Sequence, residues 1–236
     1  MHAVEHPAPD PDAPLIVLVH GLLDSGASFD GVVAELTPEF TVVTYDRRGW
    51  GQSRDDPPPT SLADHAQDTL SLIRDRRATV VGHSYGGTVG LMAAFLAPER
   101  VASLAVFEPT VPWTDWWPDY DEMMERSAPL QPMFRRWREG VAPRTPEIRA
   151  VDEVSTARDF SFVAEPPFDL AELAVPRLVG GSVDTTPWDY ESGERLADIL
   201  DADLVRFADA GHTVHRTHPR EFAEFARQTA ALARAR

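Results

Sequence analysis

The chain of 236 residues contains no cysteine, and none of its 22 cationic side chains is a lysine. The lack of cysteine excludes disulfide bonds, thiolate zinc sites and cysteine nucleophiles. The lack of lysine excludes Schiff-base chemistry through a lysine amine. Any covalent nucleophile must therefore be another residue type.

Long apolar runs are also missing, and none reaches the roughly 18 residues that a membrane-spanning helix needs. The first residues, "MHAVEHPAPDPDAP", have neither the basic start nor the apolar stretch of a secretory signal. We expect a cytoplasmic protein with no membrane partner.

Positive charge is scarce, since the formal net charge is −16. A field of this sign opposes the contacts with phosphate that nucleic-acid binding requires, so we expect no nucleic-acid partner. With 43% hydrophobic residues the chain can bury a full core. Its length suits one large domain, or one domain with an insertion.

Short apolar runs rich in β-branched residues alternate with amphipathic segments, which predicts an α/β fold with a mostly parallel sheet and helices on both faces. The predicted strands are 15–20, 41–45, 78–83, 101–107, 175–181 and 202–208. The predicted helices are 61–73, 85–96, 190–200 and 219–233, the first capped by Ser61.

Residues 111–170 break this rhythm with many prolines, several charge clusters and no buried-strand pattern. They hold four of the six tryptophans, which is too much apolar material for a solvated loop. We therefore predict a helical cap insertion at 111–170 within a core formed by 1–110 and 171–236.

The motif Gly82-His83-Ser84-Tyr85-Gly86 fits G-x-S-x-G where a predicted strand meets a predicted helix. In that geometry the serine lies on a strained turn, and small residues on either side let the helix pass close to the strand. The motif predicts that Ser84 is a nucleophile.

A serine hydroxyl needs a base to take its proton and an acid to orient that base. Asp184 and His212 each follow a predicted strand, where ligand sites of open α/β sheets occur. Glu108 also ends a strand, so it is the alternative acid. We favour Asp184 because 28 residues separate it from His212 (212 − 184), which is enough for one helix and one strand.

Five segments together resemble the α/β-hydrolase superfamily, in the family's order and over nearly the whole chain. They are "HGLLDSG" at 20–26, "YDRRGWGQS" at 45–53, "GHSYGG" at 82–87, "GGSVDTTP" at 180–187 and "AGH" at 210–212. The sequence departs from the family at its start, where only 14 residues precede the strand at 15–20. We predict at most one short strand there.

The resemblance implies that Ser84 attacks a carbonyl, that His212 acts as general base and then acid, and that Asp184 orients His212. It also implies an oxyanion hole made by the backbone N–H groups of Leu22 and Tyr85.

The resemblance implies a serine hydrolase that cleaves a small apolar or aromatic carboxylic ester or lactone, without a cofactor. Two alternatives remain open: a lyase or C–C bond hydrolase with the same triad, and a non-catalytic ligand-binding member of the fold. A small-molecule substrate is the expected partner.

We predict a substrate pocket lined by His20, Glu108, Trp113, Trp117 and Trp137. The tryptophans, with Trp116 and Phe134, could instead form the core of the cap. The spacing of His212, His215 and His218 invites a metal site, but no carboxylate or cysteine set accompanies it in the sequence, so we predict none.

Overall fold

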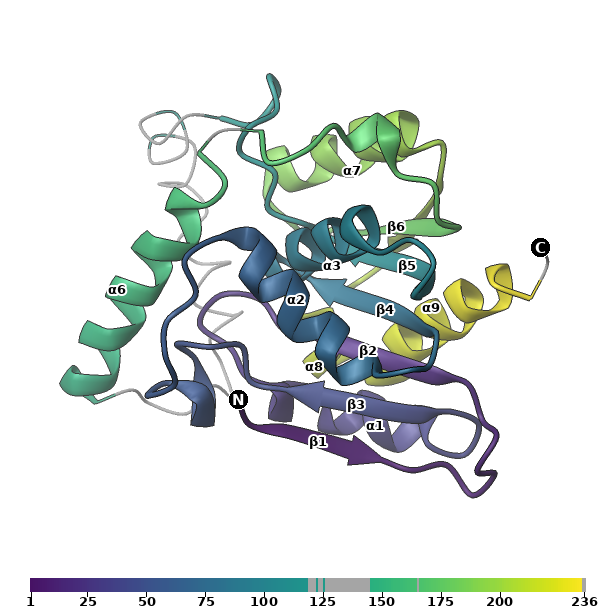
Figure 1. Cartoon of the computed structure of the whole chain (residues 1–236). Helices are drawn as coiled ribbons and strands as arrows, with labels where there is room; N and C mark the ends of the chain where they lie inside the picture. The colour runs from purple at the N-terminus through teal and green to yellow at the C-terminus, as the bar shows by residue number, and fades with distance from the viewer. Residues whose placement is uncertain (119–121, 123–124, 126–144, 165, 235–236) are drawn as a thin grey trace.

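The computed structural model describes residues 1–118, 122, 125, 145–164 and 166–234. Its centre is a seven-stranded sheet in the order β1-β3-β2-β4-β5-β6-β7 (Figure 1). Only β1 runs antiparallel to its neighbour, and the other pairs are parallel. The predicted fold class is confirmed.

The strands agree closely with the apolar runs of the sequence. They are β1 (Ala3–His6), β2 (Leu15–Val19), β3 (Thr41–Tyr45), β4 (Ala78–His83), β5 (Val101–Phe107), β6 (Arg177–Ser182) and β7 (Asp203–Phe207). Every residue of β2, β3 and β4 is buried, which explains why their sequences show no polar alternation. β1 is the single short strand expected before residue 15.

Helices cover both faces of the sheet. On one face lie α2 (Leu62–Ile73), α3 (Tyr85–Leu96) and α7 (Pro187–Leu200), and on the other lie α1 (Asp30–Leu36) and α9 (Pro219–Leu232), with α8 (Val214–Thr217) beside α9. Each group buries its own apolar cluster against the sheet. The Ser61 hydroxyl accepts a hydrogen bond from the Asp64 N–H, as its predicted cap role requires.

Between β5 and β6 the chain leaves the sheet, and the described part of this segment contains α6 (Pro146–Ser161). Figure 1 shows α6 beside the edge where the parallel strands end. Among the described residues, no helix combines the length and the apolar character needed to cross a bilayer.

Candidate active site

Ser84 lies at the turn between β4 and α3 in a conformation that side chains rarely adopt, with φ 53° and ψ −129°. The glycines around it have a steric reason. A Cβ added to Gly82 would lie 2.3 Å from the Gly86 carbonyl oxygen, and one added to Gly86 would lie 2.1 Å from the Val19 oxygen. The start of α3 therefore lies in contact with both β4 and the end of β2, and the half-buried Ser84 lies at the tip of the turn.

Glu108 comes directly after β5, which is the neighbour of β4 in the sheet. The backbone N–H of Ser84 donates to the Phe107 carbonyl at 2.8 Å. Glu108 is therefore the residue that follows a direct backbone contact with Ser84. Its carboxylate is buried, and Oε1 accepts a hydrogen bond from the Ser182 N–H at 2.7 Å. The second oxygen, Oε2, lies 2.6 Å from Nδ1 of His212.

His212 lies on the loop after β7, and two contacts hold this loop over the sheet. His83 Nε2–H donates to the His212 carbonyl at 2.6 Å, and the Ser182 hydroxyl donates to the Gly211 carbonyl at 2.9 Å. Burial, followed by the neighbouring His215 and His212, lowers the pKa of His83 well below its ordinary value. A neutral His83 that carries its proton on Nε2 fits this contact.

The acid beside His212 differs from the one that the sequence favoured. Asp184 is exposed, and its backbone N–H donates to the Ala210 carbonyl at 3.3 Å. The carboxylate on His212 Nδ1 is Glu108, the alternative acid. The physical reason is the strand order: Glu108 directly follows β5, which lies between β4 and β6, and the loop that carries His212 bends back to it.

A second carboxylate, that of Asp189 at the start of α7, lies close to the same imidazole. A carboxylate oxygen of Asp189, one of Glu108 and a ring nitrogen of His212 all lie within 4.8 Å of one another. Burial, then the charge of Glu108, raises the pKa of Asp189 to about 7. Burial also disfavours the charged form of His212, but the Glu108 hydrogen bond and the nearby carboxylates outweigh it and raise the pKa of His212. Sequence reasoning missed Asp189, whose local signal, its place three residues after the cap Thr186, predicts a helix start and not a role at the site.

The two expected oxyanion donors flank Ser84. Tyr85 is the first residue of α3, a position whose N–H has no partner within its helix. A Cβ added to Gly21 would lie 2.8 Å from the Ser84 Cβ, so the backbone just before Leu22 runs against the serine. The structure thus brings Ser84, His212, Glu108 and the segments of both donors together.

His20 is held by the backbone of the loops around it. Its side chain is fully buried, Nδ1 lies 2.8 Å from the Gly21 oxygen, and Nε2 lies 2.9 Å from the Arg47 backbone nitrogen. Because both ring nitrogens bond to the backbone, His20 braces the loop. Burial, then the Arg47 charge, lowers the pKa of His20 to about 4, so the ring is neutral.

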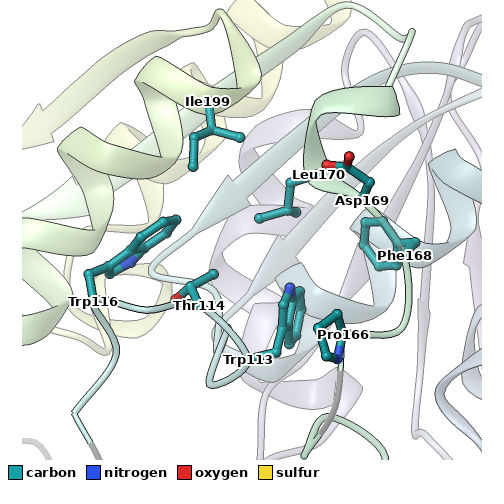
Figure 2. Close-up of a pocket in the computed structure, with 8 residues that line it drawn as sticks. All are labelled: Trp113, Thr114, Trp116, Pro166, Phe168, Asp169, Leu170 and Ile199. Atoms are coloured by element: carbon teal, nitrogen blue, oxygen red, sulfur yellow. The ribbon is translucent and has the colours of Figure 1, made fainter.

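Of the predicted pocket tryptophans, Trp113 lines a cavity of about 480 Å³ (Figure 2). The cavity wall also includes Phe168 and Ile199, the latter near the far end of α7. Trp117 packs, half-buried, against the apolar cluster under α2, α3 and α7. Trp137 and Phe134 lie outside the described residues.

The histidines after His212 are accounted for by protein partners. His215 Nε2 lies 3.2 Å from Asp24 Oδ2, and Arg216 also binds Asp24. His218 Nδ1 lies 2.9 Å from the Thr217 hydroxyl. Asp24, His83 and His215 bring three potential ligand atoms within 4.8 Å of one another. Asp24 already binds His215 and Arg216, and Nε2 of His83 binds the His212 carbonyl, whereas Nδ1 of both rings is buried without a hydrogen-bond partner. We assign no metal to either cluster.

Comparison with known proteins places this geometry in a family. Residues 16–225 match the model of the alpha/beta hydrolase family, and the chain belongs to this family of enzymes. The provisionally named carbamate hydrolase RutD of Rhizobium rhizogenes is 29% identical over 94% of both chains. A hydrolase from Pseudomonas aeruginosa has a TM-score of 0.70 at 26% identity, covering 97% of this chain and 93% of its own. An α/β hydrolase from Sphaerobacter thermophilus has a TM-score of 0.71 at 26% identity, covering 94% and 95%.

Proposed function

We propose that this α/β hydrolase is a serine hydrolase that cleaves a small apolar or aromatic carboxylic ester or lactone through an acyl-serine intermediate. The observation that carries the proposal is the 2.6 Å contact between Glu108 and His212, beside the strained turn that presents Ser84. Each group has the chemical type and the environment that its step needs.

In the proposed reaction, His212 Nε2 takes the proton of the Ser84 hydroxyl as the oxygen attacks the substrate carbonyl carbon. The resulting oxyanion accepts hydrogen bonds from the N–H groups of Leu22 and Tyr85. His212 then gives its proton to the leaving oxygen, the C–O bond breaks, and an acyl-serine remains. Water, deprotonated by His212, releases the acid and restores Ser84.

Glu108 has two tasks in this scheme. As acceptor for Nδ1–H it fixes the tautomer that leaves Nε2 free to accept a proton, and its charge stabilises the imidazolium that forms. The Ser182 N–H holds the other carboxylate oxygen, so the acid enters the reaction already oriented.

A carbamate is a second candidate substrate. The relative from Rhizobium rhizogenes that matches over 94% of both chains carries the name of a carbamate hydrolase. A carbamate also presents a carbonyl to the serine, so the same residues would act through a carbamoyl-serine.

The test uses an alkyl fluorophosphonate, which labels activated serines, together with p-nitrophenyl acetate, an aryl carbamate and a lactone as substrates. We expect the wild type to be labelled at Ser84 and to hydrolyse at least one substrate class. Ser84→Ala should lose both properties, with activity down by several orders of magnitude. Ser71→Ala, at an exposed position on α2, is the matched control. Undiminished turnover by Ser84→Ala would refute the proposal.

A further inference from the structure

A fully buried ion pair joins α6 to the sheet next to the candidate oxyanion hole. Arg47 follows β3, Asp159 lies near the end of α6, and both side chains have 0% exposure. Arg47 Nη1 donates to Asp159 Oδ2 at 2.9 Å across 112 residues of sequence. Such a pair is costly to bury, so its stability alone does not explain it.

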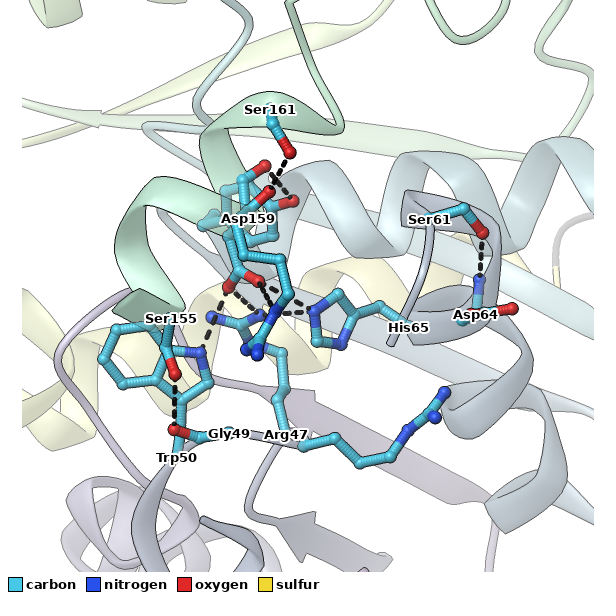
Figure 3. Close-up of polar contacts among 12 residues, drawn as sticks. Arg47, Gly49, Trp50, Ser61, Asp64, His65, Ser155, Asp159 and Ser161 are labelled. Carbon is cyan, nitrogen blue, oxygen red and sulfur yellow. Dashed lines mark hydrogen bonds and ion pairs between the residues drawn. The ribbon is translucent and has the colours of Figure 1, made fainter. Parts of the chain in front are cut away.

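Asp159 gathers donors from several elements (Figure 3). Its carboxylate accepts from Trp50 Nε1 at 3.1 Å and lies 3.2 Å from His65 Nε2, while its backbone carbonyl accepts from the Tyr85 hydroxyl at 2.8 Å. Burial opposes the charged carboxylate, but the Arg47 charge and the His65 contact outweigh it and lower the pKa of Asp159. The carboxylate is therefore charged at every pH at which the protein is expected to work.

The other donors of Arg47 bind the backbone of the loop after β2. Nε donates to the His20 carbonyl and Nη2 to the Gly21 carbonyl, both at 3.0 Å. The backbone N–H of Arg47 also donates to Nε2 of His20. The other ring nitrogen of His20, Nδ1, lies 2.8 Å from the same Gly21 oxygen. The Gly21 carbonyl is thus held from two sides.

The Gly21 carbonyl and the Leu22 N–H belong to one peptide unit. This unit is planar and trans, so its N–H points opposite to its C=O. Donors that hold the Gly21 oxygen therefore also set the direction of the Leu22 N–H, the expected oxyanion donor. Hydrogen bonds to the carbonyl polarise the unit as well, which strengthens the N–H as a donor.

We propose that Arg47 and Asp159 are positioning residues of the oxyanion hole. Asp159, which packing of α6 places against Arg47, fixes the guanidinium of Arg47, and Arg47 in turn orients the Leu22 N–H. This inference rests on the serine hydrolase function proposed above. Through the Tyr85 hydroxyl, Asp159 also contacts the residue that carries the second expected donor.

Asp159→Asn is the first test. It keeps the shape of the side chain but replaces one carboxylate oxygen with an amide NH₂ group, which would face the donors of Arg47, Trp50 or His65. We expect the rate constant of fluorophosphonate labelling and the kcat for an aryl ester to fall about 10-fold or more, with KM changed less than about threefold. A transition-state contact affects kcat in this way, whereas a loose binding site would raise KM.

The matched control is Asp152→Asn. Asp152 is a second buried carboxylate of α6, and it pairs with Arg54 at 3.5 Å. If Asp159 only holds α6 in place, kcat should fall by a similar factor in the two variants when their loss of stability is the same. Equal loss of kcat in both variants at matched Tm overturns the inference.

The double variant Arg47→Met/Asp159→Leu separates stability from positioning. Replacing a buried ion pair by apolar residues commonly restores stability, whereas a single replacement leaves one charge without its partner. We expect a Tm close to that of the wild type, but a kcat still about 100-fold low, because the Gly21 carbonyl has lost Arg47. A double variant with wild-type Tm and wild-type kcat overturns the inference.

Labelling of the wild type distinguishes the two proposals. If the fluorophosphonate does not label Ser84 in the wild type, the serine hydrolase function itself fails. If the wild type is labelled and Asp159→Asn is labelled as fast, the function stands and the positioning role of Asp159 fails.

Discussion

Glu108 Oε2 lies 2.6 Å from His212 Nδ1, although 104 residues separate the two along the chain. The contact joins the end of β5 to the loop after β7 and crosses over β6. Glu108 also accepts the Ser182 N–H from the end of β6, so one carboxylate connects the ends of two neighbouring strands to the imidazole.

The first prediction follows from this contact. Glu108→Gln should lower kcat by about 10⁴-fold at neutral pH, because an amide no longer fixes the tautomer or stabilises the imidazolium. Asp184→Asn should stay within about threefold of the wild type, as the exposed side chain of Asp184 is not the partner of Nδ1. Steady-state kinetics on an aryl ester measures both. A large loss of kcat in Asp184→Asn together with a nearly unchanged kcat in Glu108→Gln would reverse the assignment.

The second prediction concerns pH. The base must be neutral to accept a proton, and Glu108 and Asp189 raise the pKa of His212 against the opposing effect of burial. Activity is therefore lost as pH falls through the pKa of His212, which is raised above its ordinary value. Asp189→Asn removes one of the charges that raise this pKa, so the acid limb of kcat/KM should move to lower pH, by less than about one unit.

The exposed Asp198, on the same helix α7, provides the control for this experiment. Asp198→Asn should leave the acid limb in place. An acid limb that does not move in Asp189→Asn would show that Asp189 does not influence the ionisation of His212.

The third prediction concerns the crossing of α3 over the end of β2. Gly86→Ala should lower the free energy of unfolding by about 3 kcal/mol or more, because its Cβ would lie 2.1 Å from the Val19 backbone oxygen. A Cβ at Gly90, one turn further along α3, would meet two side-chain tips, Leu104 Cδ1 at 3.1 Å and Val80 Cγ1 at 3.4 Å, and such tips can move. Gly90→Ala also gains helix propensity, so its stability should stay within about 1 kcal/mol of the wild type. Urea unfolding compares the two, and similar losses in both would contradict the crossing argument.

The sequence by itself determined the strands of the sheet, because strands buried on both faces and amphipathic helices each have a characteristic local pattern of apolar residues. The predicted ranges 41–45, 78–83 and 101–107 coincide with β3, β4 and β5. It also determined the turn at Ser84, since the glycine at 82 is required by a contact with Gly86, four residues further along the chain. The glycine at 86 is required by a distant contact, with Val19 of β2. The ends of strands and helices shifted by a few residues where caps and loop contacts compete.

Only the tertiary structure decided which side chains meet at the strand ends. Both Asp184 and Glu108 follow a strand, and the choice between them depends on how the loop carrying His212 folds back, held by His83 and Ser182. The Arg47–Asp159 pair likewise joins elements 112 residues apart and carries no local pattern. Periodicity reports which face of an element is buried, whereas a contact between two distant polar groups depends on the packing of every element between them.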